Sequence, residues 1–211
     1  MKVVCEAGRT LRWFRLQLVA MAVLVGGAGL LPASDGPFPV WAETPPASSA
    51  DTPVDLAPGG NYAAGIRLRI PNQGWSFQVP AQWHATVFED SELPFLISNE
   101  GSSMGMMFPL AQATADEVEH ELAQPLVLSQ GVSFVPTGSL VRTESRLLRS
   151  YVSEATVGRA LAVKGPSDQW VIYFLMGPGN ESEGYDALLD QLADSTRFGG
   201  EESGSEPREG I

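Results

Sequence analysis

The segment 101–105, which reads Gly-Ser-Ser-Met-Gly, contains the residue best suited to covalent chemistry. It fits the G-x-S-x-G pattern, in which a serine at a strand-to-helix turn attacks an acyl group with help from a histidine and an acid. Residues 104–108 have the alternating pattern of a strand, however, and His120, the only later histidine, falls in a predicted helix. We therefore interpret the segment as a turn between two strands and predict no catalytic residue. A serine hydrolase that uses Ser103 is the alternative.

The histidines and methionines are the candidate metal ligands. His84 and His120 are the only histidines, and their spacing fits no paired-histidine metal motif. The thioethers of a methionine-rich segment, 104–107, could bind Cu(I), but methionines also fill gaps in cores. Strand alternation places Met104, Met106 and Phe108 on one face, as expected for a core. We predict no metal site and no cofactor.

Arg142, Arg146 and Arg149 form the only basic cluster beyond the N-terminal leader. Guanidinium groups bind carboxylates and phosphates through several hydrogen bonds, so the cluster is a possible contact for an anion or a partner. The alternative is that each arginine pairs with a surface carboxylate. No glycine-rich phosphate loop accompanies the cluster.

Composition narrows the range of partners. The chain has 211 residues and a net charge of −12, which suits one domain with appendages and excludes a nucleic-acid partner. The same charge disfavours an anionic membrane surface. Cys5 is the only cysteine and lies in the leader, so the processed chain cannot form a disulfide or use a catalytic thiol.

Residues 1–42 have the order of features of a signal peptide. A basic start is followed by the apolar segment 16–31 and by a small-residue site that ends at Ala42, with an earlier site at Ala33. We predict export to a periplasmic, secreted or thylakoid-lumen-like compartment, with no stable membrane insertion after cleavage. An uncleaved membrane anchor is the alternative, although the apolar segment is short for one.

The remaining chain divides into three parts. Residues 43–64 are rich in Pro, Ser, Ala and Gly and are predicted to be a disordered linker. Residues 199–211 are predicted to be a disordered acidic tail. Residues 65–198 carry the periodic apolar patterns of a single folded domain.

Hydrophobic periodicity predicts the elements of that domain. Alternation over 66–70 and 75–79, with a turn at 71–74 between them, predicts a hairpin. Thr114 and Glu117 form a capping box, which predicts a helix from about 115. A second amphipathic helix is predicted to end near Phe198. Further strands are predicted over 83–88, 95–98, 104–108, 147–155, 159–164 and 169–176.

The strand over 170–176 fixes the fold class, because it is apolar on both faces. Such a strand belongs in the centre of a sheet that is covered on both sides. With only two clear helices available, we predict an α+β domain in which a mainly antiparallel β-sheet has helices packed on both faces.

The two ends of the domain resemble a known family. The segment 74–83, Gly-Trp-Ser-Phe-Gln-Val-Pro-Ala-Gln-Trp, is similar to the opening strand of PsbP/Mog1-like domains, and 195–198, Ser-Thr-Arg-Phe, is similar to their ending. The resemblance implies an α/β/α sandwich over about 65–198. Functions in the group range from photosystem accessory subunit to Ran-binding protein, and no functional residue of the group can be matched here.

The sequence therefore predicts an exported, non-enzymatic accessory or binding module that acts through protein–protein contacts. The partner is expected to be another protein. Besides the hydrolase that uses Ser103, a second alternative is a regulatory domain associated with a secreted enzyme or a secretion system.

Overall fold

The computed structural model describes residues 52–71, 73–89, 91, 93–128, 131–154 and 156–199. The predicted signal peptide, the first part of the linker and residues 200–211 of the tail lie outside the described residues. Within these ranges, no helix has both the length and the apolar character needed to cross a membrane.

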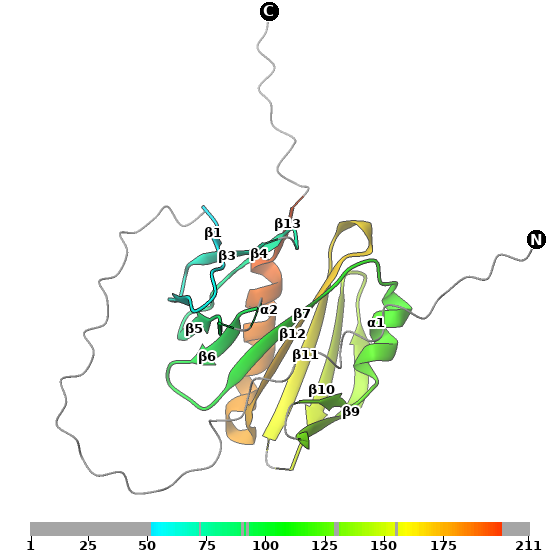
Figure 1. The fold of residues 1–211 in the computed structure, drawn as a ribbon. Coiled ribbons are helices and arrows are strands. Elements are labelled where there is room, and N and C mark those ends of the chain that lie inside the picture. Colours follow the sequence, from blue (N-terminus) through cyan, green and yellow to red (C-terminus); the bar gives the residue numbers. More distant parts are fainter. Residues whose placement is uncertain are drawn as a thin grey trace, which may run out of the picture.

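A nine-stranded sheet forms the centre of the molecule (Figure 1). Every neighbouring pair of strands in it is antiparallel. In spatial order the strands are β2 (Asn61–Tyr62), β5 (Trp83–Thr86), β6 (Phe95–Ser98), β7 (Met104–Leu110), β12 (Trp170–Pro178), β11 (Thr156–Lys164), β10 (Arg146–Val152), β9 (Ser133–Arg142) and β8 (Leu126–Val127).

The central strand β12 contributes to two cores, one on each face of the sheet. Val171, Tyr173 and Leu175 point into one core, and Ile172 and Phe174 point into the other. All of β12 except Pro178 is buried. The prediction of a central strand covered on both faces is confirmed.

Helix α2 (Tyr185–Ser195) and a second, small sheet cover the first core. The small sheet has the order β1 (Val54–Asp55), β3 (Arg67–Ile70), β4 (Trp75–Gln78) and β13 (Arg197–Phe198). The predicted hairpin is present as β3 and β4, which pair antiparallel. It belongs to this separate sheet, however, so one face of the domain is covered by a helix and by strands.

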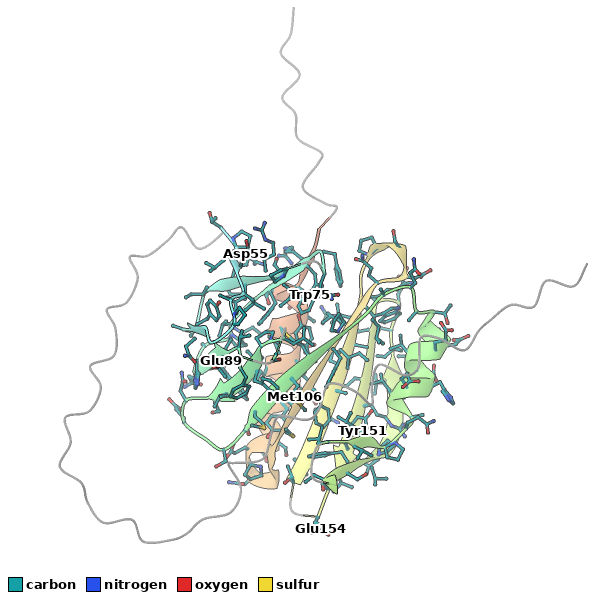
Figure 2. The ribbon with its side chains drawn as sticks, in the orientation of Figure 1. Asp55, Trp75, Glu89, Met106, Tyr151 and Glu154 are labelled. Atoms are coloured by element: carbon teal, nitrogen blue, oxygen red, sulfur yellow. The ribbon has the colours of Figure 1, made fainter. Side chains whose placement is uncertain are left out.

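Helix α1 (Ala115–Leu122) covers the second core on the opposite face. The predicted capping box is present, and Val118 and Leu122 are buried. The Tyr151 hydroxyl donates to the Leu122 carbonyl at 2.8 Å, which ties β10 to the end of the helix. Met106 and Tyr151 belong to this second core and Trp75 to the first (Figure 2). The predicted fold class, a mainly antiparallel sheet with helices on both faces, is confirmed.

Strand β9 was not expected from the sequence, because it lacks regular alternation. The pairing of β9 with β10 shifts register between Leu148 and Ser150, opposite Gly138, whose φ is +64°. Pro136 interrupts the pattern as well, and a proline cannot donate a ladder hydrogen bond. On its other side, β9 pairs with β8 only at Ser133 and Phe134.

The expected linker, 43–64, overlaps two strands of the structure. β1 runs parallel to β3, and β2 pairs with β5, so residues 54–62 add one strand to each sheet. Leu56, between them, is 9% exposed and belongs to the first core. The boundary at residue 64 is therefore corrected. The residues that make these contacts are few and lie among prolines and glycines, which is why composition concealed them.

Candidate functional site

A hollow of about 490 Å³ lies between the turns at one end of β5, β6 and β7 and the N-terminal half of α2. The turn into β5, the β6–β7 turn, the 3-10 helix over Gly179–Gly184 and α2 all contribute to its wall. The lining residues are Ala81, Gln82, Trp83, Ser98, Glu100, Gly101, Ser103, Glu181, Gly184, Tyr185, Ala187, Leu188 and Gln191.

Ser103 is buried in the wall of the hollow, with 3% of its surface exposed. Its hydroxyl donates to Glu181 Oε2 at 2.5 Å and lies 2.6 Å from the Tyr185 hydroxyl. The backbone N–H of Ser102 donates to the other carboxylate oxygen of Glu181 at 3.2 Å. Together these hydrogen bonds connect the β6–β7 turn to the start of α2.

Two glycines provide the space for these contacts. A β-carbon at Gly101 would lie 2.6 Å from the Glu181 carboxylate, and one at Gly177 would collide with the Ser103 and Tyr185 hydroxyls. Contacts this close do not occur for real side chains, so Glu181 or Ser103 would have to move. Both glycines are therefore part of the site.

Hydrogen bonding and burial shift the pKa values of Glu181 and Tyr185 in opposite directions. The Ser103 hydroxyl and the Ser102 N–H lower the pKa of Glu181 by hydrogen bonding to its ionised form. Burial raises the pKa of Tyr185; the Ser103 hydrogen bond partly offsets this effect, and the nearby charge of Glu181 adds a smaller increase. An efficient general acid or base has a pKa near the working pH, and both shifts lead away from neutral pH.

Neither histidine is hydrogen bonded to Ser103, although all three residues lie in the described part of the chain. His84 Nδ1 bonds to Asn99 Oδ1 at 2.6 Å. His120 lies on α1, which packs on the opposite face of the central sheet from α2. The arrangement that the hydrolase alternative needs, a serine within reach of a histidine with an acid behind it, is not assembled. Ser103 does lie in a turn between two strands, as predicted, and in that turn it is buried.

The methionines lie where strand alternation predicts. Met107 is buried in the first core, while Met104, Met106 and Phe108 face the second. The described residues contain no group of three or more histidine, cysteine, aspartate or glutamate side chains that could hold a metal ion.

The three arginines predicted as a possible anion contact do not form one patch. Arg142 pairs with Asp116 and Glu119 of α1. Arg146 points to the other face and pairs with Asp190 and Asp194 of α2. The buried Nε of Arg149 has no hydrogen-bond partner among the residues that the structure describes.

Sequence reasoning missed Glu181 and Tyr185 as neighbours of Ser103. They follow β12 in the chain and reach Ser103 only because β7 and β12 pair, with Met104 opposite Met176. The sequence signal that could have indicated this contact is a pair of glycines, Gly101 and Gly177, near the ends of these two strands. Their purpose becomes visible only once the strands are paired.

Comparisons with known proteins were made by sequence and by structure. No model of a protein family and no curated protein matches the sequence. Solved structures that match include the Saccharomyces cerevisiae Ran-binding protein Mog1p, with 9% identity, a TM-score of 0.40 and coverage of 63% of this chain and 94% of that chain. Cyanobacterial PsbP (CyanoP) from Synechocystis sp. PCC 6803 matches with 11% identity, a TM-score of 0.39 and coverage of 68% and 95%. Both proteins bear the names of the group that the sequence resembles.

Proposed function

We propose that this chain is an exported, non-enzymatic accessory or binding module that acts through contacts with another protein. The burial and hydrogen bonding of Ser103, the residue best suited to covalent chemistry, are the observation that supports the non-enzymatic part of the proposal. Its hydroxyl is buried and already donates to Glu181. In this position the serine has a structural role, holding the β6–β7 turn against α2.

The hydrolase alternative lacks a suitable base. A serine nucleophile must lose its proton to a neighbouring group as it attacks. Glu181 is the acceptor within reach, and its lowered pKa makes it a weaker base than an ordinary carboxylate. A substrate carbonyl would also have to approach an oxygen that belongs to a residue only 3% exposed.

A fluorophosphonate probe separates the two functions, because it labels activated serines covalently. We expect the probe to label the wild-type protein no more than it labels the Ser103→Ala variant. Ser102→Ala, which changes the exposed neighbour, is the matched control. Stoichiometric labelling lost only in Ser103→Ala would establish the hydrolase and overturn the proposal.

The binding function is tested by site-specific photocrosslinking in the organism that makes the protein. A photoreactive residue is placed at one exposed position on each face, including one beside the hollow and one on α1. We expect adjacent positions on one face to crosslink to the same protein. A chain that crosslinks to nothing from any face is not a binding module.

Export rests on the sequence alone, since residues 1–42 lie outside the described residues. A basic start, a short apolar segment and a small-residue site support it. Intact-mass measurement of the extracytoplasmic protein should give a chain that begins near Glu43. Full-length protein confined to the cytosol would contradict this part of the proposal.

A further inference from the structure

The two faces of the central sheet are covered unequally over β6 and β7. On the first face, which α2 and the small sheet cover, Leu96 and Met107 are each only 1% exposed. On the second face of the same strands, Phe95, Met104 and Phe108 are half-buried at the border of the second core. The second face of β6 and β7 therefore presents apolar side chains that another molecule can still reach.

Strand register joins these side chains into one continuous surface. Ile97 is half-buried and lies opposite Met104 in the pairing of β6 with β7. The ring of Phe88, which is 38% exposed, packs edge to face on that of Phe95, with the two centroids 5.0 Å apart. A continuous apolar surface is a mark of an interaction site. We define the open face as the surface formed by Phe88, Phe95, Ile97, Met104 and Phe108.

Helix α1 covers the other half of the second face. Its end is tied to β10 by the hydrogen bond from Tyr151, and its Glu119 contacts Arg142 at the end of β9. Figure 1 shows α1 beside β9 and β10, away from β5 and β6. Of the helices in the described ranges, α1 alone contributes residues to the second core. Strands lie about 4.8 Å apart and a helix is about 10–12 Å wide, so the area over β5, β6 and β7 has the width of one further helix.

The segment that builds the open face carries only negative charge. The sequence between Ile70 and Arg142 contains no lysine and no arginine, and it supplies β5, β6, β7 and α1. A partner with lysines or arginines around an apolar surface is attracted to such a region, whereas an acidic partner is repelled. The same stretch contains eight acidic residues, which are Glu89, Asp90, Glu92, Glu100, Asp116, Glu117, Glu119 and Glu121.

We propose that the open face binds an amphipathic helix of the protein partner, with lysines or arginines along the borders of its apolar side. This inference rests on the proposed binding function and adds the surface that is used and the chemistry of the partner. The helix lies beside α1 and completes the layer on the second face. Strand β7 has seven residues and spans about 23 Å, which corresponds to about 15 helical residues.

The test uses the chain that begins at Glu43, the form that export is proposed to leave, with ¹³C-labelled methionine methyl groups. The probe is a synthetic peptide of about 15 residues, with leucines on one side of a helix and lysines along the borders of that side. We expect the Met104 methyl signal to shift and saturate, with a Kd on the order of 0.1 mM. Met107 faces the first core and should not shift. Single replacements by leucine assign the four methionine signals of this chain, Met104, Met106, Met107 and Met176.

A second peptide tests the role of charge. It keeps the same leucines and replaces every lysine with glutamate, so its apolar side is unchanged and its charge is reversed. We expect it to bind at least about tenfold more weakly, because the segment that builds the open face is acidic. Added salt should weaken binding of the lysine peptide, since salt screens the attraction between exposed charges.

Matched variants locate the contact. Ile97→Gln places an amide in the middle of the open face and should weaken binding of the lysine peptide about tenfold. Val141→Gln introduces the same side chain on β9, at a position that is 54% exposed, and should leave the Kd unchanged. An unchanged Met107 signal in Ile97→Gln shows that the first core is intact.

Several results would overturn the inference. They are equal affinity for the glutamate peptide, a Met107 shift as large as that of Met104, equal weakening by Val141→Gln, and no shift at about ten times the expected Kd. A Met104 signal that moves with protein concentration alone would assign the open face to a second copy of this chain instead.

The proposed function is judged separately. If the titration fails while photocrosslinking still finds a partner on another face, the helix site is wrong and the binding function stands. If no face crosslinks to a partner, the proposed function is wrong independently of the titration.

Discussion

At the scale of single residues, Ser103 shows how much a buried hydroxyl can contribute. Replacing it with alanine removes a donor to Glu181 and leaves the Tyr185 hydroxyl without its partner. We expect Ser103→Ala to lower the free energy of unfolding by about 1–3 kcal/mol, the usual cost of such a loss. Urea denaturation measures this change. Ser102→Ala, at an exposed position, should cost under about 0.5 kcal/mol, and equal costs for the two variants would contradict the assignment.

The ionisation of Glu181 makes part of the stability depend on pH. Hydrogen bonds from Ser103 and Ser102 hold the pKa of Glu181 below its ordinary value of 4.5 in the folded state. A group with a lowered folded pKa stabilises the protein fully above the unfolded pKa and loses that contribution as the pH falls through the folded one. The stability difference between wild type and Glu181→Gln should therefore be largest above about pH 5 and shrink on acidification.

Denaturant melts of both proteins at a series of pH values between 7 and 3 measure this difference. Glu144→Gln serves as the control, since it alters an exposed carboxylate in the β9–β10 turn, away from the hollow. If the difference between wild type and Glu181→Gln stayed constant to pH 3, hydrogen bonding to the ionised carboxylate would not be the source of its effect.

At the scale of elements, β4 depends on Phe77. This side chain is fully buried in the first core. The centroid of its ring lies 5.9 Å from that of the Trp75 ring and 6.3 Å from that of the Tyr173 ring. Phe77→Ala should cost roughly 3–5 kcal/mol, a large part of the stability of a small domain. Phe88→Ala makes the same chemical change at a side chain that is 38% exposed and should cost far less. Thermal or urea unfolding of the two variants provides the comparison.

Helix α1 begins at a complete capping box. The Thr114 side chain accepts from the Glu117 N–H at 3.3 Å, and the Glu117 carboxylate accepts from the Thr114 N–H at 2.8 Å. Thr114→Ala should therefore cost about 0.5–2 kcal/mol, while Thr114→Ser retains a capping hydroxyl and should restore most of the loss. Urea denaturation of the pair tests this, and a serine variant as unstable as the alanine variant would argue against the cap.

The same scale shows which features were predictable. The hairpin of β3 and β4, the capped start of α1 and the apolar strand β12 are encoded by neighbouring residues, and the sequence predicted all three. Strand β9 was not predicted, because Pro136 and Gly138 interrupt its alternation of apolar and polar residues. The contact of Ser103 with Glu181 was not predicted for a different reason. It depends on the pairing of strands that are distant in the sequence, and no local sequence pattern indicates that pairing.

At the scale of the whole molecule, the ordered domain begins earlier than composition indicates. A chain trimmed to residues 52–199 should keep nearly the stability of a chain that begins at Glu43. A chain trimmed to 65–199 loses β1, β2 and Leu56, whose burial alone contributes roughly 1.5–3 kcal/mol. The free energies of unfolding of the two trimmed chains, measured by urea denaturation, are compared. If both unfold at the same denaturant concentration, β1 and β2 do not contribute to the fold.

The last strand, β13, has a consequence for the timing of folding. It pairs with β4, with Phe198 opposite Trp75, so the small sheet joins the beginning of the domain to its end. Contacts between such distant segments form slowly, because a long loop has to close before they contribute. The edge of β4 that faces β13 stays unpaired until Arg197 and Phe198 have been synthesised and have reached it. A chain that lacks these residues should therefore stay incompletely closed, with the edge of β4 open to a strand from another molecule.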